Sequence, residues 1–232
     1  MGSARHIGII LDGNRRYAKS ESKTQLEGHK LGAENVKRLI MEWAPELGIR
    51  ELTLYAFSMQ NFNRPKPEFE YLMELFSKFF GLLTRSKGFR EKNIRVRFLG
   101  RIKLFPKSVY DSMHKIMEKT RENTGLVVNF CMAYGGREEI VDATRALAQD
   151  VAVGKIRAEE VSPEMLNRYM YLREEPELII RTGGEHRTSN FLMWQSWYSE
   201  WFFVEKFWPE FTKEDLQHIL LEFTQRERRF GK

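Results

Sequence analysis

Short apolar stretches alternate along this chain with longer segments of helical periodicity. Six stretches rich in β-branched and aromatic residues are predicted to be strands: residues 7–11, 51–57, 94–99, 126–132, 178–180 and 201–204. Helical spacing is found near residues 28–44, 67–87, 107–122, 136–152, 162–170, 188–195 and 212–226. Because the strands are nearly continuously apolar and alternate with helices, we predict an α/β fold with a mostly parallel central sheet of about six strands, flanked by helices.

No internal repeat, low-complexity tract or long linker interrupts this alternation. A single domain over residues 1–232 is therefore predicted, a length that one α/β domain can reach. Residues 1–5 precede the first strand and are expected to be disordered or a remnant of cloning. No apolar run reaches the roughly 18 residues of a membrane span, and no signal-peptide pattern opens the chain. We expect a cytoplasmic protein, with membrane association as an open alternative.

The composition narrows the choice of ligands. Apolar residues make up 42% of the chain, charged residues 30%, and the formal net charge is +6. Such a basic chain suits phosphorylated small molecules, anionic lipid or nucleic acid. The absence of a long Lys/Arg block argues against nucleic acid, which we do not expect as a partner. The one cysteine, Cys131, excludes an intrachain disulfide and a cysteine-cluster metal site.

The residues that follow the predicted strands share one kind of chemistry. Ligands of parallel sheets bind at the carboxyl ends of the strands. Glycine, arginine and small polar residues recur at these ends, as DGNRR (12–16), SMQNFNRP (58–65), YGGR (134–137) and RTGGEHRTSN (181–190). Glycine amides followed by helix N-termini bind anions, and arginine forks match phosphate oxygens. This rim holds enough positive charge to predict a site for two diphosphates.

Asp12 is the one acid in the first of these segments. A carboxylate among phosphates is repelled unless a cation lies between them, and Mg²⁺ is commonly bound by one or two carboxylates plus substrate phosphates. The alternative is that Asp12 caps the following helix while the arginines are solvated or paired. No P-loop, dinucleotide fingerprint or zinc-ligand spacing is found in the sequence.

The predicted helix at 67–87 has an unusually wide apolar band. It includes Phe69, Leu72, Met73, Leu75, Phe76, Phe79, Phe80, Leu82 and Leu83. An ordinary core helix explains this band. Because the helix directly follows the strand end at 58–65, it is also suited to form one wall of a hydrophobic tunnel that receives the hydrocarbon part of a diphosphate.

Seven motifs, read in order, carry a family resemblance. They are HIGIILDGNRRYAK, GHKLGAENV, LTLYAFSMQNFNRP, NFCMAYGGREEIVDA, IIRTGGEHRTSNFLMWQSWYSEWFF, FWPEF and RERRFGK, which together run from His6 to Gly231. This chain resembles the cis-prenyltransferases of the undecaprenyl diphosphate synthase family, and its DGNRR form is similar to archaeal and eukaryotic members. The resemblance implies a homodimer with a hydrophobic tunnel. It also implies the Mg²⁺-dependent condensation of an allylic prenyl diphosphate with isopentenyl diphosphate to give a Z-polyprenyl diphosphate, with peripheral membrane contact for product release as an open point.

The resemblance also implies roles for individual residues. The residues expected to act in catalysis are Asp12, Asn14, Ser58 and Asn61. On the allylic side, the expected substrate-binding residues are Gly13, Arg15, Arg16, Tyr17, His29, Phe62 and Arg64. The isopentenyl diphosphate site is expected at Arg181, Arg187 and Ser189. Asp12 and Glu200 are the expected Mg²⁺ ligands, Glu200 across the dimer, and the partner's site is expected to be completed by Arg229 and Gly231.

Two positions depart from the family pattern. Gln60 stands where the family commonly has a glutamate, and Gln25 stands where it usually has an arginine. Both changes fall on the donor side. They leave open a prenyltransferase of the same fold with an unusual donor or an acceptor other than isopentenyl diphosphate. A non-catalytic subunit that binds prenyl lipids is a further alternative, although the retained Asp12, Arg181 and Arg187 argue against it.

Overall fold

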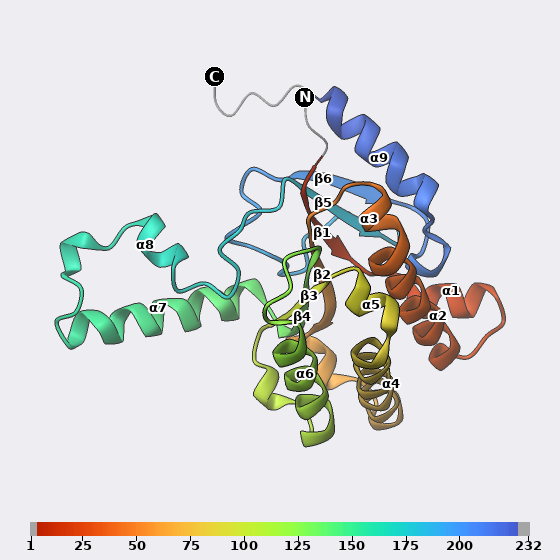
Figure 1. Cartoon of the computed structure of the whole chain (residues 1–232), viewed down its shortest axis with the longest axis horizontal. Helices are drawn as coiled ribbons and strands as arrows, with labels where there is room; N and C mark the ends of the chain where they lie inside the picture. The colour runs from red at the N-terminus through yellow and green to blue at the C-terminus, as the bar shows by residue number, and fades with distance from the viewer. Residues whose placement is uncertain (1–3, 227–232) are drawn as a thin grey trace.

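A six-stranded, entirely parallel sheet forms the centre of the computed structural model, which describes residues 4–226 (Figure 1). The strands are β1 (His6–Ile10), β2 (Glu51–Ser58), β3 (Arg95–Leu99), β4 (Val127–Tyr134), β5 (Leu178–Thr182) and β6 (Glu200–Val204). Their order is β3-β4-β2-β1-β5-β6, and each neighbouring pair is parallel. The predicted α/β fold and all six predicted strands are confirmed.

The helices surround this sheet. They are α1 (Asn14–Ser20), α2 (Gln25–Arg38), α3 (Ala44–Glu46), α4 (Lys66–Arg85), α5 (Lys87–Glu91), α6 (Lys107–Thr120), α7 (Gly136–Ala152), α8 (Pro163–Asn167) and α9 (Lys213–Gln225). A π-helical turn, Leu39–Trp43, joins α2 to α3. Figure 1 shows α7 and α8 extending from one side of the body as an arm. Among the described residues, no helix is both long and apolar enough to cross a bilayer.

The prediction of a helix at 188–195 is wrong. The segment is a series of turns, in which Ser189, Asn190 and Leu192 have positive φ angles of 48°, 64° and 44°. These turns place Phe191 and Leu192 together on the sheet face formed by Ile10, Tyr55, Cys131 and Ile179. Phe191 and Leu192 are adjacent in the sequence, and the burial of both against the sheet does not follow helical spacing. Tertiary packing therefore determines the conformation of this segment and overrides its local pattern. The helix predicted at 162–170 is confirmed only in part, as the short α8.

The amino end of the sheet is tied down by its first described residues. Ala4 is buried, and the backbone N–H of Arg5 donates to Glu177 Oε2 at 2.5 Å. Residues 4 and 5 are thus held against the body of the protein, whereas residues 1–3 lie outside the described part of the chain.

His6 is a buried titratable group at this amino end, away from the rim of basic residues. Its Nε2 lies 2.8 Å from Thr53 Oγ1, and its Nδ1 is buried with no hydrogen-bond partner among the described residues. Burial, opposed in part by the negative charge of Glu174, lowers the pKa of His6 to about 4. The imidazole is therefore neutral in the folded protein at pH 7.

We expect His6 to make the fold sensitive to acid. The unfolded imidazole binds a proton below pH ~6.5, whereas the folded one does so only near its lowered pKa of about 4. Stability is therefore lost as the pH falls through this window, by up to about 3 kcal/mol. Urea unfolding between pH 7 and pH 4.5 should show a shallower loss for His6→Gln than for wild type. The control is His218→Gln, at an exposed position. Equal losses of stability for wild type, His6→Gln and His218→Gln would contradict this role of His6.

Candidate active site

Asp12 and Arg181 meet at the carboxyl ends of the two central strands. Ile10 of β1 is paired with Arg181 of β5. Asp12, two residues after Ile10, therefore lies at the same edge of the sheet as Arg181. Arg181 is only 3% exposed, and its Nη2 donates to Asp12 Oδ2 at 2.8 Å. The hydroxyl of Thr182 donates to the Asp12 carbonyl at 2.8 Å and accepts from the Asp12 N–H at 3.1 Å. The position of the Asp12 carboxylate is thus fixed by the sheet itself.

The other oxygen of Asp12 faces the loop that opens α1. Oδ1 accepts from the Gly13 N–H at 2.6 Å and lies 3.2 Å from Nη2 of Arg16. Gly13 has a φ of 103°, and a Cβ there would come within 2.6 Å of the Phe207 ring. Only glycine fits this turn without strain. The alternative prediction that Asp12 caps α1 is not what the structure shows, because the N-cap is Gly13 without a side-chain hydrogen bond.

Asn14 begins α1 and lies beside Gly28 and Gly32 of α2. Its Nδ2 donates to the Leu11 carbonyl at 3.3 Å, while its Oδ1 is buried with no hydrogen-bond partner among the described residues. A Cβ at Gly32 of α2 would come within 2.2 Å of this oxygen, so the glycine leaves room for it. A buried amide oxygen without a partner is costly, which indicates a site that a ligand or a water completes.

A cluster around Glu68 forms the opposite wall. Its Oε1 lies 2.9 Å from His29 Nε2, 4.0 Å from Arg15 Nε, and also accepts from Arg64 Nη1. Burial lowers the pKa of His29, and the hydrogen bond with Glu68 only partly opposes this. Burial alone would raise the pKa of Glu68, but His29 and Arg64 outweigh it and lower that pKa. Glu68 therefore acts as the anionic anchor of three predicted substrate-binding residues.

Glu68 was not among the residues predicted from the sequence. Its spacing of four residues from Arg64, at the start of a predicted helix, is a signal for an ion pair that could have identified it. Glu185 was missed in the same way, although it lies in the RTGGEHR segment. It binds Nη1 of Arg16 at 3.1 Å and also pairs with Arg187.

The loop around Ser189 completes this edge. Nη1 of Arg181 donates to Ser189 Oγ at 2.7 Å and to the carbonyl of Arg187. Beneath the loop, the fully buried Glu139 accepts from Gln195 Nε2 at 2.9 Å and from the Tyr134 hydroxyl. Burial raises the pKa of Glu139, opposed by these hydrogen bonds. The structure thus supports the loop through a buried polar network that the sequence did not predict.

Ser58 and Asn61 lie at the carboxyl end of β2. The backbone N–H of Ser58 donates to Asn61 Oδ1 at 2.9 Å, which holds the short turn Met59–Asn63 against the strand. Phe62 points elsewhere: its ring lies 5.1 Å from Phe57 and 5.6 Å from Phe105, in the aromatic core. The ring of Tyr17 lies 5.9 Å from Lys23 Nζ. Neither Phe62 nor Tyr17 lines the cavities described next.

Two polar cavities occupy this edge and share one boundary. The first, the basic cavity, is about 660 Å³ and is lined by Arg15, Arg16, Lys19, Lys23, Arg64 and Arg187; among residues 4–226, its acids are Asp12 and Glu185. The second, the strand-end cavity, is about 560 Å³ and is lined by Ser58, Gln60, Asn61, Arg181 and Ser189. Both are also lined by Asp12, Asn14, His29 and Arg64. The predicted site residues of the rim are therefore brought together around two adjoining cavities.

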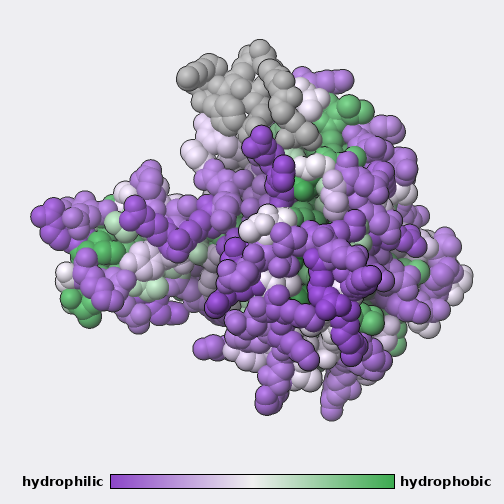
Figure 2. Space-filling model, in the orientation of Figure 1, coloured by the Kyte–Doolittle hydropathy of each residue, from purple (hydrophilic) through white to green (hydrophobic). Residues whose placement is uncertain are grey.

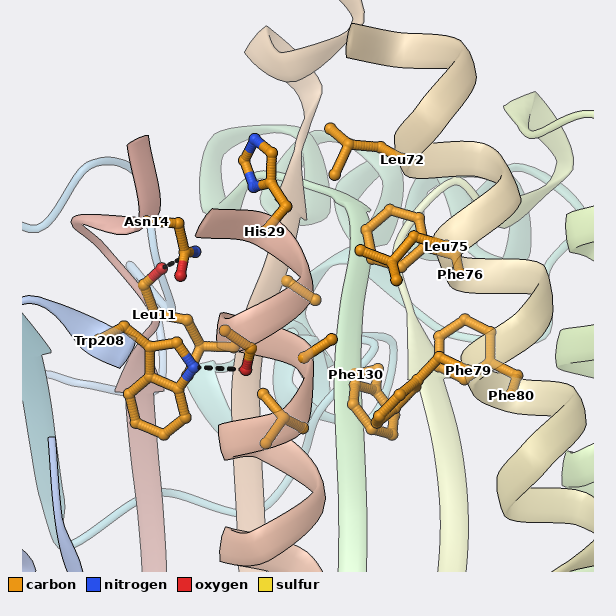
Figure 3. Close-up of a pocket in the computed structure, with 14 residues that line it drawn as sticks. Leu11, Asn14, His29, Leu72, Leu75, Phe76, Phe79, Phe80, Phe130 and Trp208 are labelled. Atoms are coloured by element: carbon orange, nitrogen blue, oxygen red, sulfur yellow. Dashed lines mark hydrogen bonds between the residues drawn. The ribbon is translucent and has the colours of Figure 1, made fainter. Parts of the chain in front are cut away.

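An apolar cavity, the inner pocket, begins at the same boundary. It has a volume of about 80 Å³ and runs from Asn14 and His29 between α2 and α4 (Figure 3). Its apolar lining includes Leu72, Phe76, Phe80 and Phe130. Polar cavities for charged groups thus adjoin an apolar pocket at a shared wall.

Glu200 lies apart from this constellation. Through Leu178 of β5, Glu200 lies at the same level of the sheet as Ile7, which is five residues before Asp12. At about 3.3 Å per residue, Glu200 is therefore roughly 16 Å from Asp12 along the strand direction. Within one chain it pairs with Arg226 at 2.9 Å. Arg229 and Gly231 lie outside the described residues. Among residues 4–226, no cluster of three or more potential metal ligands is found.

Comparison with known proteins decides the family. The family model described as putative undecaprenyl diphosphate synthase matches residues 10–231 of this chain. The chain belongs to this family of cis-prenyltransferases. The resemblance predicted from the motifs is therefore confirmed, and the protein is a prenyl-transferring enzyme.

Individual relatives agree with this assignment. The chain is 47% identical over 230 residues to the tritrans,polycis-undecaprenyl-diphosphate synthase (geranylgeranyl-diphosphate specific) of Pyrococcus horikoshii, covering 98% of this chain and 87% of that protein. It is 45% identical over 228 residues to the isoprenyl transferase of Bacillus anthracis, covering 97% and 87%.

A solved structure shows the same fold throughout. The crystal structure of lavandulyl diphosphate synthase from Lavandula x intermedia, in complex with dimethylallyl diphosphate, superposes with a TM-score of 0.93 at 34% identity and covers 99% of both chains. This match confirms that the parallel sheet and its helices have the arrangement found in a prenyl diphosphate synthase.

Gln25 lines the basic cavity, at the first residue of α2. We expect Gln25→Arg to lower the KM for an allylic donor about fivefold, because one added charge-assisted hydrogen bond to a diphosphate is worth roughly 1 kcal/mol. Steady-state kinetics with a fixed isopentenyl diphosphate concentration measure this change. Gln217→Arg, at an exposed position of α9, controls for added net charge. An unchanged KM would show that Gln25 has no part in donor binding.

Proposed function

We propose that this protein condenses an allylic prenyl diphosphate with isopentenyl diphosphate to form a Z-polyprenyl diphosphate. The observation that carries the proposal is the junction of the basic cavity, the strand-end cavity and the inner pocket at Asn14 and His29. One cavity suits the diphosphate of the donor, the other suits that of isopentenyl diphosphate, and the pocket suits the hydrocarbon of the donor. Binding both substrates side by side supplies the proximity that carbon–carbon bond formation requires.

The residues at the junction have distinct tasks in this reaction. Arg15, Arg16 and Arg64 bind the diphosphate of the donor and stabilise its charge as the allylic C–O bond breaks. Arg181 and Ser189 hold isopentenyl diphosphate, whose terminal alkene carbon forms the new bond to the allylic carbon. The neighbouring methylene then loses a proton, which leaves a new double bond in the chain. The carboxamide of Asn14 borders all three cavities, where it can orient the departing proton.

Asp12 fits the role of a Mg²⁺ ligand. Its side chain is 31% exposed and lines both polar cavities. A single carboxylate that shares its site with substrate phosphates matches the preference of Mg²⁺, which keeps few protein ligands. When bound, the ion would supply positive charge for the departing diphosphate. Glu200 does not reach this site within one chain, so its predicted role as a ligand requires a partner subunit.

We also propose a homodimer. The arm of α7 and α8 extends from the body (Figure 1), and Figure 2 shows hydrophobic side chains exposed at its end on a mainly hydrophilic face. Val153, directly after α7, and Trp197, between β5 and β6, are 67% and 69% exposed, and exposed apolar side chains that gather in a patch mark interaction surfaces. Pairing of two chains would cover such side chains and would allow Glu200 and the segment with Arg229 and Gly231 to act on the partner's site.

A panel of donors tests the proposed reaction. The protein is incubated with Mg²⁺, radiolabelled isopentenyl diphosphate and dimethylallyl, geranyl, farnesyl or geranylgeranyl diphosphate, and the dephosphorylated products are sized. We expect incorporation of label into elongated products, with geranylgeranyl diphosphate favoured by the similarity to the archaeal synthases. No product with any donor, in conditions where a known synthase is active, would refute the proposal.

A second candidate is favoured by one observation. The inner pocket is small, and a synthase of the same fold is known in complex with the short donor dimethylallyl diphosphate. A prenyltransferase that uses a short donor, or an acceptor other than isopentenyl diphosphate, would fit such a pocket. The same panel, repeated with radiolabelled dimethylallyl diphosphate, separates the two candidates, because this one predicts a product from dimethylallyl diphosphate that is not elongated further.

A further inference from the structure

The inner pocket is too small for a long prenyl chain. Its volume is about 80 Å³, roughly half that of an engineered apolar cavity of about 150 Å³ that binds a single benzene molecule. A chain of several isoprene units must therefore leave the pocket as it grows. The packing of the walls of the inner pocket indicates where the chain can leave.

The route along the sheet is closed by an aromatic cluster. The rings of Phe80, Phe98 and Phe130 lie 4.7 to 5.6 Å from one another. Phe80 is 1% exposed and Phe130 is 2% exposed. Opening this end would separate packed core side chains, which typically costs several kcal/mol.

The wall between α2 and α4 is much thinner. Ala33 of α2 and Leu75 and Phe79 of α4 line the inner pocket and also line a groove on the outer surface. All three are only partly buried. Figure 3 shows Leu75 and Phe79 extending from α4 toward α2. One layer of side chains therefore separates the inner pocket from the outside of the protein.

The surface groove beyond this wall, the outer groove, has a volume of about 400 Å³. Its lining adds Tyr71 and Leu82 to the three residues of the wall, and Leu82 is 61% exposed. The charged residues of its lining are Lys30, Glu34, Lys37, Glu74 and Lys78. Lysine stems cover apolar surface while their charged ends stay in water. Such a groove suits a hydrocarbon chain better than a charged ligand.

Helix α4 can move at this wall more easily than elsewhere. It packs more extensively against α6 than against α2, so the seam with α2 is the weaker of the two. Gly81 lies in the helix directly after Phe79 and Phe80, and a Cβ there would meet no atom closer than 3.7 Å. No close packing requires this glycine, yet it costs the helix about 1 kcal/mol relative to alanine. It leaves α4 easier to bend beside Phe79.

We infer that the growing prenyl chain leaves the inner pocket sideways, between Ala33 and the pair Leu75 and Phe79, and binds in the outer groove. This inference rests on the proposed chain elongation. It assigns an apolar binding site to a surface outside the diphosphate cavities. It also makes the outer groove a determinant of product length.

Leu82→Glu tests this route, because the side chain lies in the outer groove and does not line the inner pocket. A carboxylate in the lining of this groove disfavours contact with a hydrocarbon. We expect the main product to be shortened by at least one isoprene unit. Leu221→Glu is the matched control, since Leu221 is 60% exposed on α9, and it should leave product length unchanged. Thermal melts of both variants check that the fold is intact.

Three outcomes would overturn the inference without touching the proposed reaction. One is an unchanged product length in Leu82→Glu; another is an equal shortening in both variants. The third is a wild-type product with only one added unit. Phe98→Ala identifies the alternative route: longer products from this variant, together with unchanged products from Leu82→Glu, would place the chain along the sheet. Failure of the proposed function is distinguishable, because wild type would then make no elongated product from any donor.

Discussion

Replacing Asp12 with asparagine should reduce kcat by at least about a thousandfold, which corresponds to roughly 4 kcal/mol of transition-state stabilisation. Asp12 is the one carboxylate that lines both polar cavities among the described residues. Asparagine keeps the size of the side chain and can still accept from the Gly13 N–H, but it removes the charge that Mg²⁺ requires. Incorporation of labelled isopentenyl diphosphate measures the rate.

The control for Asp12→Asn is the same substitution on the surface. Asp111 lies on α6 and pairs with Lys107 at 2.6 Å, so Asp111→Asn should keep wild-type activity. Circular dichroism and the melting temperature show whether Asp12→Asn retains the fold. An Asp12→Asn enzyme with a near-wild-type rate would remove the metal role from this residue.

Arg181→Lys should raise the KM for isopentenyl diphosphate about a hundredfold, equivalent to about 2.7 kcal/mol, with little change in the KM for the allylic donor. The guanidinium binds Asp12 with one nitrogen and Ser189 with another. A lysine ammonium cannot reproduce this fork, so the Ser189 loop and the diphosphate would lose their shared partner. Varying one substrate at a time separates the two KM values.

A loss of stability alone would not raise the KM for isopentenyl diphosphate while leaving the KM for the allylic donor unchanged. Arg101 forms a comparable fork, with Nε and Nη2 each 2.9 Å from the two oxygens of Asp142. Arg101→Lys therefore reports what the loss of a bidentate pair does to stability, and we expect both KM values to stay at wild-type levels. Equal increases in both KM values for Arg181→Lys would argue against a specific role in the isopentenyl diphosphate site.

The strands were the most predictable part of the structure. Runs such as residues 7–11 and 126–132 are buried on both faces of a parallel sheet, so they are apolar throughout and stand out from their neighbours. The rim chemistry followed from them, because parallel strands bring their carboxyl ends to one edge. The close approach of Asp12 and Arg181 is a direct consequence of the β1–β5 pairing.

Features that depend on contacts between distant segments were not predictable in the same way. The turns at 188–195 are set by the burial of Phe191 and Leu192 and by a network with Glu139, more than fifty residues earlier in the chain. The ion pair of Glu68 with Arg64 is indicated by their spacing in the sequence, but the burial of Glu68 against His29 is not. Buried polar groups require partners, and the partners are known only once the fold is.

The geometry of the newly formed double bond gives the most direct test of cis-prenyl transfer by this chain. The purified enzyme is supplied with Mg²⁺, geranylgeranyl diphosphate and ¹³C-labelled isopentenyl diphosphate, and the dephosphorylated product is analysed by NMR. We expect each added unit to carry a Z double bond. Added units with E double bonds, or no added unit with any allylic donor, would contradict the proposed reaction.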